Sequence, residues 1–100
     1  MTLTLAIDQG THSTRAVVFD AQGRKLALGR APVDLQHISR SEIEQSPEDI
    51  LMSLEQAISD VLAQPGVDPA AIVQSGLATQ RSSVLAWERS SGRPLSPVLS

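Results

Sequence analysis

Three short apolar segments, joined by very short polar connections, constrain the fold of this chain most. They cover residues 3–8, 15–20 and 25–30, and in the first of them Leu and Ile alternate with Thr, Ala and Asp. This period of two is typical of a strand with one buried face. A parallel return between neighbouring strands needs a crossover of about a dozen residues or more, and these connections are far shorter. The three segments therefore predict an antiparallel meander.

One long helix is predicted after the meander. The sequence Ser46-Pro47-Glu48-Asp49 supplies an N-cap hydroxyl, a proline at the first helical position and acids at the positive end of the helix dipole. The apolar stripe that follows at helical spacing consists of Ile50, Leu51, Leu54, Ala57, Ile58, Val61 and Leu62. We predict a helix over residues 47–63, ended by Pro65-Gly66. The side chains expected to face the sheet are Ile50, Leu54, Ile58 and Val61.

The remaining segments complete an α/β pattern. The expected elements are an extended stretch at 33–38, a helical turn at 68–71, a buried strand at 72–78, a strand at 83–87 and a turn at 89–92. Trp87 is expected to pack on the last hairpin. Strands on either side of a helix predict a mixed sheet with the helix on one face. A single helix leaves the other face exposed unless a further segment covers it, so the chain is expected to be cut short.

Composition excludes several classes of protein. One hundred residues allow one small domain or a piece of a larger one. The chain has no cysteine, which removes disulfides, thiolate catalysis and Cys-type zinc sites. A net charge of −3 gives no electrostatic reason to expect nucleic acid or an anionic membrane as a partner. The apolar runs are short and the first residues carry no basic signal segment, so we expect a cytoplasmic protein.

The connection between the first two strands carries the main functional signal. Asp8 ends the first strand, and an acid there could hold a hydrated magnesium ion, which takes few protein carboxylates. Gly10 allows close backbone approach, and Arg15 can neutralise phosphate charge. The hydroxyl donors between them are Thr11, Ser13 and Thr14. A polar hairpin in which Asp8 caps its own turn explains the same residues, and this loop alone leaves both interpretations open.

The segments AIDQGTHSTRAVVFDAQGRKL, SPEDI and GLATQRSSVLAWERSSGRPL closely resemble, in order and spacing, the start of the FGGY carbohydrate kinases, the glycerol kinase branch most of all. The resemblance covers essentially the whole chain. It implies that residues 1–100 are the N-terminal portion of a ribonuclease H-like, actin-type ATPase domain, with the rest of that domain and a second one absent. It also implies ATP and Mg²⁺ as cofactors and a small-molecule sugar or polyol as substrate. The residues implied at the ATP phosphates are Asp8, Gly10, Thr11, His12, Ser13 and Arg15, with Asp8 near the magnesium through water.

A second matching segment ends the strand expected at 72–78. Glycerol kinases carry Asn-Gln-Arg-Glu there, and the Arg and Glu bind the polyol hydroxyls. Gln80 and Arg81 match this motif, while Ser82 takes the place of the Glu, so the resemblance implies substrate binding by these three residues. A serine hydroxyl cannot replace a carboxylate that accepts two strong hydrogen bonds from a diol, which argues against glycerol itself. His12 takes the place of a usual Thr or Ser, and we expect it to face solvent rather than to bind phosphate.

Other residues receive structural interpretations. His37 has no metal-ligand spacing around it, and the acids from Glu42 to Asp49 are expected to be solvated or to begin the helix. The family's catalytic Asp lies beyond residue 100, so no catalytic residue is assigned and residues 1–100 alone are expected to be inactive. Two alternatives stay open: a ribonuclease H-like nuclease, and a truncated non-catalytic module that docks its exposed sheet face on a partner. Homo-oligomer formation is also left open.

Overall fold

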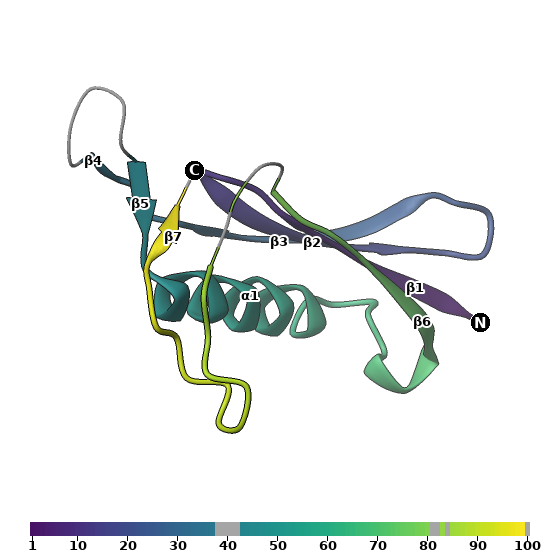
Figure 1. Cartoon of the computed structure of the whole chain (residues 1–100). Coiled ribbons are helices and arrows are strands. Elements are labelled where there is room, and N and C mark those ends of the chain that lie inside the picture. Colours follow the sequence, from purple (N-terminus) through teal and green to yellow (C-terminus); the bar gives the residue numbers. More distant parts are fainter. Residues whose placement is uncertain (38–42, 81–82, 84, 100) are drawn as a thin grey trace.

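The computed structural model describes residues 1–37, 43–80, 83 and 85–99. Figure 1 shows one long helix lying along one face of a twisted sheet, with a second, small sheet beyond the start of the helix. In the described residues the larger sheet has four strands and the smaller has three. No helix in these ranges is long and apolar enough to cross a membrane.

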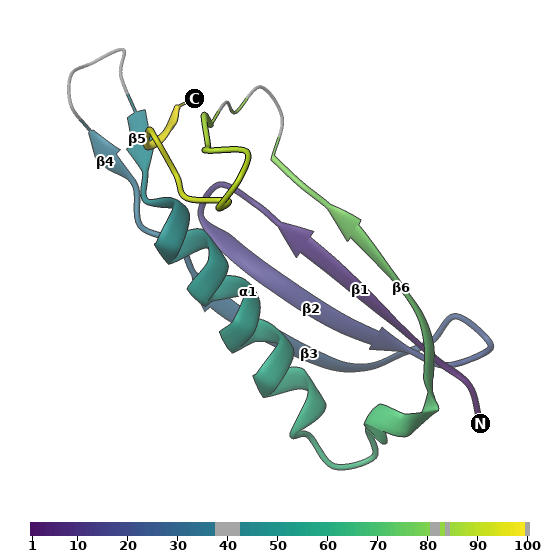
Figure 2. The same cartoon turned by 60° about the horizontal axis from the view of Figure 1, so that its bottom comes forward.

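The predicted meander is confirmed. Strands β1 (Leu3–Gln9), β2 (Ser13–Phe19) and β3 (Lys25–Pro32) pair antiparallel in sequence order. Strand β6 (Ile72–Ala78) adds parallel to β1, which gives the order β3-β2-β1-β6 (Figure 2). The chain crosses from the meander to β6 through the helix, as a parallel pairing requires. This pairing brings the C-terminal ends of β1 and β6 to the same edge of the sheet.

Helix α1 (Pro47–Leu62) begins where the sequence predicts and ends one residue earlier. Ser46 is its N-cap and accepts a hydrogen bond from the Asp49 N–H at 3.4 Å. The helix packs mainly against β3 and β2. It approaches β3 very closely at Gly29, where an added Cβ would overlap the carbonyl oxygen of Ala57 and lie 2.8 Å from the Val61 nitrogen.

The buried face of α1 differs in part from the prediction. Its fully buried residues are Ser53, Ala57 and Val61. Ile58 is half-buried and packs against the core, as predicted, whereas Ile50 and Leu54 are half-buried and do not belong to that core. Leu51, which belongs to the predicted stripe, is 59% exposed. The close approach to β3 is the physical reason, because only small side chains fit along the line of contact and the larger apolar residues flank it. The core between helix and sheet consists of Leu3, Leu5, Ala16, Val18, Ala27, Ala31, Ala57 and Val61.

The last third of the chain holds both confirmed and wrong predictions. The helical turn is present as η1 (Pro69–Ala71), and residues 89–91 form the predicted turn. The strand at 72–78 is present as β6, but it is not buried, because it lies at the edge of the sheet and Val73 and Leu77 are more than 60% exposed. The strand predicted at 83–87 is wrong for the described residues. Only Trp87 forms a bridge there, with Pro94, and residue 84 lies outside the described ranges.

The small sheet consists of β4 (Gln36–His37), β5 (Ile43–Gln45) and β7 (Val98–Leu99), paired antiparallel in that order. The extended stretch expected at 33–38 is thus a strand at two of its residues, while Ile38 lies outside the described ranges. Trp87 is 62% exposed, so the expectation that it packs on the last hairpin is wrong.

Candidate functional site at the ends of strands β1 and β6

A two-residue tip joins β1 to β2. The last strand pair is Gln9 with Thr14, and the Gly10 N–H then donates to the Ser13 carbonyl at 2.9 Å. Thr11 and His12 form the exposed tip, and Ser13 is half-buried. A Cβ on Gly10 would lie 3.0 Å from the Ser13 carbonyl oxygen, which is tighter than ordinary contacts. Glycine is therefore the residue that suits the base of this turn.

The backbone carbonyls of the tip are held by other elements. The Thr11 carbonyl accepts from Gln45 Nε2 at 2.7 Å, and the His12 carbonyl accepts from the Val33 N–H at 2.9 Å. Within the described part of the chain, neither tip N–H has a protein acceptor. The two tip carbonyls are thus bound within the protein, while the tip N–H groups and the hydroxyl of the exposed Thr11 are left as donors. Such an array of backbone donors suits an anion.

Thr14 does not belong to this donor set. It is fully buried, and its Oγ1 lies 2.6 Å from the hydroxyl of Ser53 in helix α1. Ser53 Oγ donates to the Ile50 carbonyl at 2.7 Å, so Thr14 is the donor in the hydroxyl pair. The expectation that Thr14 could donate to a phosphate is therefore wrong. Its hydroxyl instead anchors the base of the turn to the helix.

Asp8 and Arg15 face each other across β1 and β2 and form an ion pair. Arg15 Nη2 lies 2.7 Å from Asp8 Oδ2, and both side chains are about half exposed, at 55% and 50%. An exposed pair of this kind contributes about 0–1 kcal/mol, so either group can turn to a ligand at little cost. No group of three or more His, Asp or Glu in the described residues could hold a metal ion. The lone carboxylate of Asp8 is compatible with a magnesium ion that keeps most of its water ligands.

Gln80 lies beside the turn, at the end of β6. Its Nε2 donates to Gln9 Oε1 at 3.2 Å, and its Oε1 accepts from Ser83 Oγ at 2.8 Å. Arg81 and Ser82, the other two residues of the predicted substrate segment, lie outside the described ranges. A cavity of about 210 Å³ opens at this edge, and it is lined by Gln9, Ile50, Thr79, Gln80, Ser83, Leu85 and Val98.

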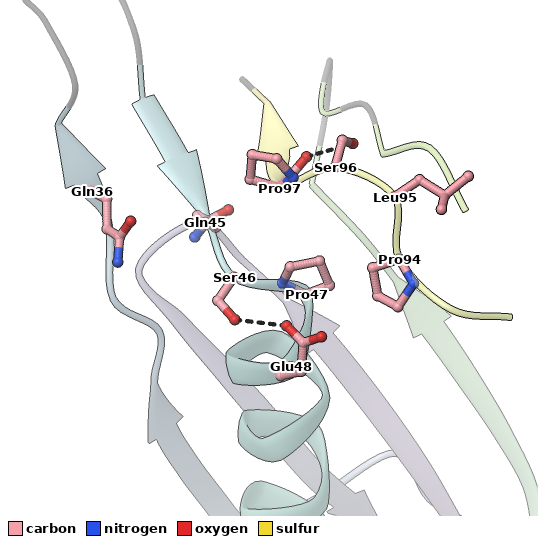
Figure 3. Close-up of a pocket in the computed structure, with 9 residues that line it drawn as sticks. All are labelled: Gln36, Gln45, Ser46, Pro47, Glu48, Pro94, Leu95, Ser96 and Pro97. Carbon is pink, nitrogen blue, oxygen red and sulfur yellow. Dashed lines mark hydrogen bonds between the residues drawn. The ribbon is translucent and has the colours of Figure 1, made fainter. Parts of the chain in front are cut away.

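A larger cavity, of about 410 Å³, lies at the start of α1 and holds none of the predicted site residues (Figure 3). Its walls are the segments 45–48 and 94–97 together with Gln36. The Ser46 hydroxyl donates to the Glu48 carboxylate at 3.0 Å, as the dashed line in Figure 3 marks. Glu48 and Asp49 place two negative charges at the first turn of the helix, which opposes phosphate binding there. The strand ends remain the better candidate for a phosphate site.

Comparison with known proteins assigns the family. Residues 3–100 match the model of the N-terminal domain of the FGGY family of carbohydrate kinases. The chain belongs to the FGGY family. The glycerol kinase of Thermus brockianus is 35% identical over 99 residues, which cover 99% of this chain and 20% of that protein.

Two solved structures share the fold with this FGGY chain. A structure described as a xyloylose kinase from Brucella ovis matches with a TM-score of 0.89 and 22% identity, over 97% of this chain and 20% of that one. The glycerol kinase of Plasmodium falciparum, solved with ADP, matches with a TM-score of 0.84 and 21% identity, over 99% and 20% of the two chains. The expected partial ribonuclease H-like α/β fold is confirmed. The chain spans about a fifth of the length of these relatives.

Sequence reasoning missed three residues of this FGGY site. Gln9, Gln45 and Ser53 contact the turn or its base, yet none of them stood out in the sequence. Ser53 carried a weak signal, because a polar residue on the buried face of a helix needs a hydrogen-bond partner. Gln45 and Gln9 carried none, since their roles depend on which distant segments come to lie beside them.

Proposed function

We propose that this chain is the N-terminal part of an ATP-dependent kinase that transfers the γ-phosphate to a hydroxyl of a sugar or polyol. One observation carries the proposal. The donor-rich turn after β1 and the Gln80 segment after β6 lie at the same edge of the sheet, and a hydrogen bond of 3.2 Å between Gln9 and Gln80 joins them. A phosphoryl-transfer enzyme needs its phosphate site and its acceptor site side by side, because catalysis is mainly positioning and electrostatic stabilisation.

The β1–β2 turn is the proposed phosphate site. The donors of Thr11, His12 and Ser13 would hold phosphate oxygens, Gly10 would allow close approach to the backbone, and Arg15 would add a positive charge. Asp8 would hold a magnesium ion through water, and that ion would supply neutralisation of phosphate charge. The ADP in the Plasmodium relative, and the membership of the chain in a kinase family, support ATP as the phosphate donor.

The end of β6 is the proposed acceptor site. Gln80, Arg81 and Ser82 would bind substrate hydroxyls, as the resemblance to the family motif implies. The catalytic base, the adenosine site and the second domain would come from a longer protein, since the relatives are about five times the length of this chain. The substrate proposed is a sugar or polyol larger than glycerol.

The test uses the native gene product that carries these residues. We expect ATP-dependent turnover, followed by coupled ADP release, with at least one acceptor from a panel of glycerol, tetritols, pentuloses and hexuloses. Arg15→Gln should lower kcat/KM for ATP about tenfold or more, because it removes a charge-assisted hydrogen bond.

Arg24→Gln is the matched control. Arg24 also pairs with an aspartate of the same meander, Asp20 at 3.4 Å, but in the β2–β3 turn at the opposite end of the sheet. It should leave kcat/KM for ATP within about twofold, since the Arg24 side chain is 77% exposed and lies far from the proposed phosphate site. No turnover with any acceptor would overturn the proposal and favour the non-catalytic docking module. Equal losses in the two variants would overturn the assignment of Arg15.

A further inference from the structure

We propose that Gln9 is a positioning residue that couples the phosphate turn to the acceptor segment. The inference rests on the proposed function of the two strand ends. It adds to that function a route by which occupancy of one site changes the affinity of the other.

Gln9 is buried, at 6% exposure, and both polar atoms of its carboxamide form hydrogen bonds. Its Nε2 donates to the Gly10 carbonyl at 2.8 Å, and its Oε1 accepts from Gln80 Nε2 at 3.2 Å. Gln80 Oε1 in turn accepts from Ser83 Oγ at 2.8 Å. The three hydrogen bonds run in one direction, from Ser83 through Gln80 and Gln9 to Gly10. We call these four residues the amide relay.

The polarity of the relay is fixed. If the Gln9 amide were reversed, its oxygen would face the Gly10 carbonyl and its NH₂ group would face the NH₂ group of Gln80, and both contacts would be repulsive. Hydrogen bonds in such a chain polarise one another, so a change at one end is felt along it. A ligand that moves the Gln80 side chain must therefore move Gln9 or break the relay.

The relay is not needed to pair the strands. The backbone already joins β1 to β6 from Leu3 with Ile72 as far as Asp8 with Ala78, and the Gln9–Gln80 bond lies beyond the last of these pairs. Its far end is the Gly10 carbonyl, at the base of the tip that carries Thr11 and His12. The relay thus connects the two proposed ligand sites. A hydrogen bond with a purely structural role would instead be expected within the paired part of the two strands.

Four variants of the native gene product test the relay. Gln9→Met and Gln80→Met keep the side-chain length and remove the hydrogen bonds, and the double variant closes a thermodynamic cycle. Gln74→Met is the matched control, because Gln74 Nε2 donates to Thr4 Oγ1 at 3.0 Å between the same two strands, away from the proposed site. For each variant, the Kd of ADP is measured with and without the preferred acceptor, and the KM of the acceptor is measured at saturating ATP.

We expect Gln9→Met to weaken ADP binding and to raise the acceptor KM, each about three- to tenfold, which is the range of one hydrogen bond. The factor by which acceptor changes the Kd of ADP should fall toward one. For the Kd of ADP, to which Gln80 makes no proposed contact, the double variant should be no worse than the single ones, because all of them interrupt the same relay. Gln74→Met should stay within about twofold of wild type. Equal effects of Gln74→Met and Gln9→Met, or additive losses in the double variant, would overturn the proposal.

Hydrogen exchange of the same proteins gives a readout that needs no activity. Gln80→Met should speed amide exchange in a peptide spanning residues 10–14, whereas Gln74→Met should not. Unchanged exchange in that peptide would overturn the relay even in an active kinase. An inactive wild type that nevertheless shows this exchange response would overturn the proposed function and leave the relay standing.

Discussion

Thr14 shows how one side chain can look functional in the sequence and be structural in the fold. Among the hydroxyls of the β1–β2 connection, it is the one that points into the protein, where it donates to Ser53. The alternation of a strand explains this, because Thr14 lies on the same face of β2 as the buried Ala16 and Val18. A hydroxyl on that face must find a partner inside the protein.

Replacement of Thr14 by valine should destabilise the chain. Thr14→Val keeps the shape and leaves Ser53 Oγ without its buried donor, which costs about 1–3 kcal/mol. Urea unfolding followed by far-ultraviolet circular dichroism measures the change in the free energy of unfolding. Ser13→Ala, next to Thr14 and half-buried, is the control and should stay within about 0.5 kcal/mol. A Thr14→Val chain as stable as wild type would contradict the anchoring role.

Ser82 carries the prediction on substrate choice. If Arg81 and Ser82 bind hydroxyls as the family motif implies, Ser82 makes a weaker contact than a carboxylate would. The lost charge-assisted hydrogen bond is worth about 1.5–3 kcal/mol, or roughly ten- to a hundredfold in affinity. A larger substrate can recover this energy through further hydroxyls, and glycerol cannot. We therefore expect the native gene product to prefer a larger polyol or sugar, and Ser82→Glu to shift kcat/KM toward glycerol. Steady-state kinetics on the acceptor panel checks this, and a wild type most efficient with glycerol would contradict it.

At the scale of elements, the contact between α1 and β3 depends on Gly29. An added methyl group there meets the helix backbone at Ala57 and Val61, so the helix must move away from the sheet. Overpacking of this kind typically costs about 1–3 kcal/mol. We expect Gly29→Ala to lower the free energy of unfolding by that amount in urea titrations.

Gly76→Ala is the control for this prediction. Gly76 is also in a strand, β6, but an added Cβ there has no neighbour within 4 Å. The substitution should change the free energy of unfolding by less than about 0.5 kcal/mol. Similar losses in both variants would mean that the strand conformation, and not the helix contact, sets the cost.

The elements predicted well were those whose signals are local. The period of two in residues 3–8 and the cap at Ser46 lie within a few residues, and both are confirmed. The strand at 83–87 failed because a strand also needs a partner. The Ala86 and Arg93 N–H groups, which would continue the ladder on either side of the Trp87–Pro94 bridge, donate instead to the hydroxyls of Ser96 and Ser91, so the pairing stays a single bridge.

The candidate site divides in the same way. The turn residues were predicted from one continuous motif, and the structure brings Gln80 beside them. The contacts of Gln45 with Thr11, Ser53 with Thr14 and Gln80 with Gln9 join residues 34, 39 and 71 positions apart. No local sequence pattern predicts contacts between residues that lie so far apart in the chain. Only the packing of helix and strands reveals which glutamine or serine supports the turn.

At the scale of the whole molecule, the chain exposes more surface than a typical folded monomer of its mass. Its accessible surface is 6793 Å², against about 5,500 Å² expected for a folded monomer of this mass. Its radius of gyration is 15.4 Å, compared with about 13 Å for a compact chain of this length. The excess comes from a sheet covered on one face and an exposed edge strand, and it supports the proposal that further chain completes the fold.

Residues 1–100 should therefore show no kinase activity by themselves. The proposed phosphate site and acceptor site lie in residues 1–100, whereas the catalytic base and the adenosine site are proposed to come from a longer protein. We expect no detectable ATP-dependent phosphorylation of glycerol or pentoses in a coupled ADP-release assay. The native gene product serves as the positive control, and substrate-dependent turnover by the purified 100-residue chain would contradict the expectation.

The inward carbonyls of the β1–β2 tip have a thermodynamic consequence. Gln45 from β5 and Val33 after β3 hold Thr11 and His12 in place when the chain folds. Fixing the backbone of one residue costs roughly 1–2 kcal/mol of conformational entropy, and here folding has already met that cost for both. An anion that binds at the tip has little left to order. Anion binding should thus carry only a small entropic penalty for ordering the turn. In a Gln45→Ala variant the turn is held less firmly before binding, so this entropic penalty should be larger.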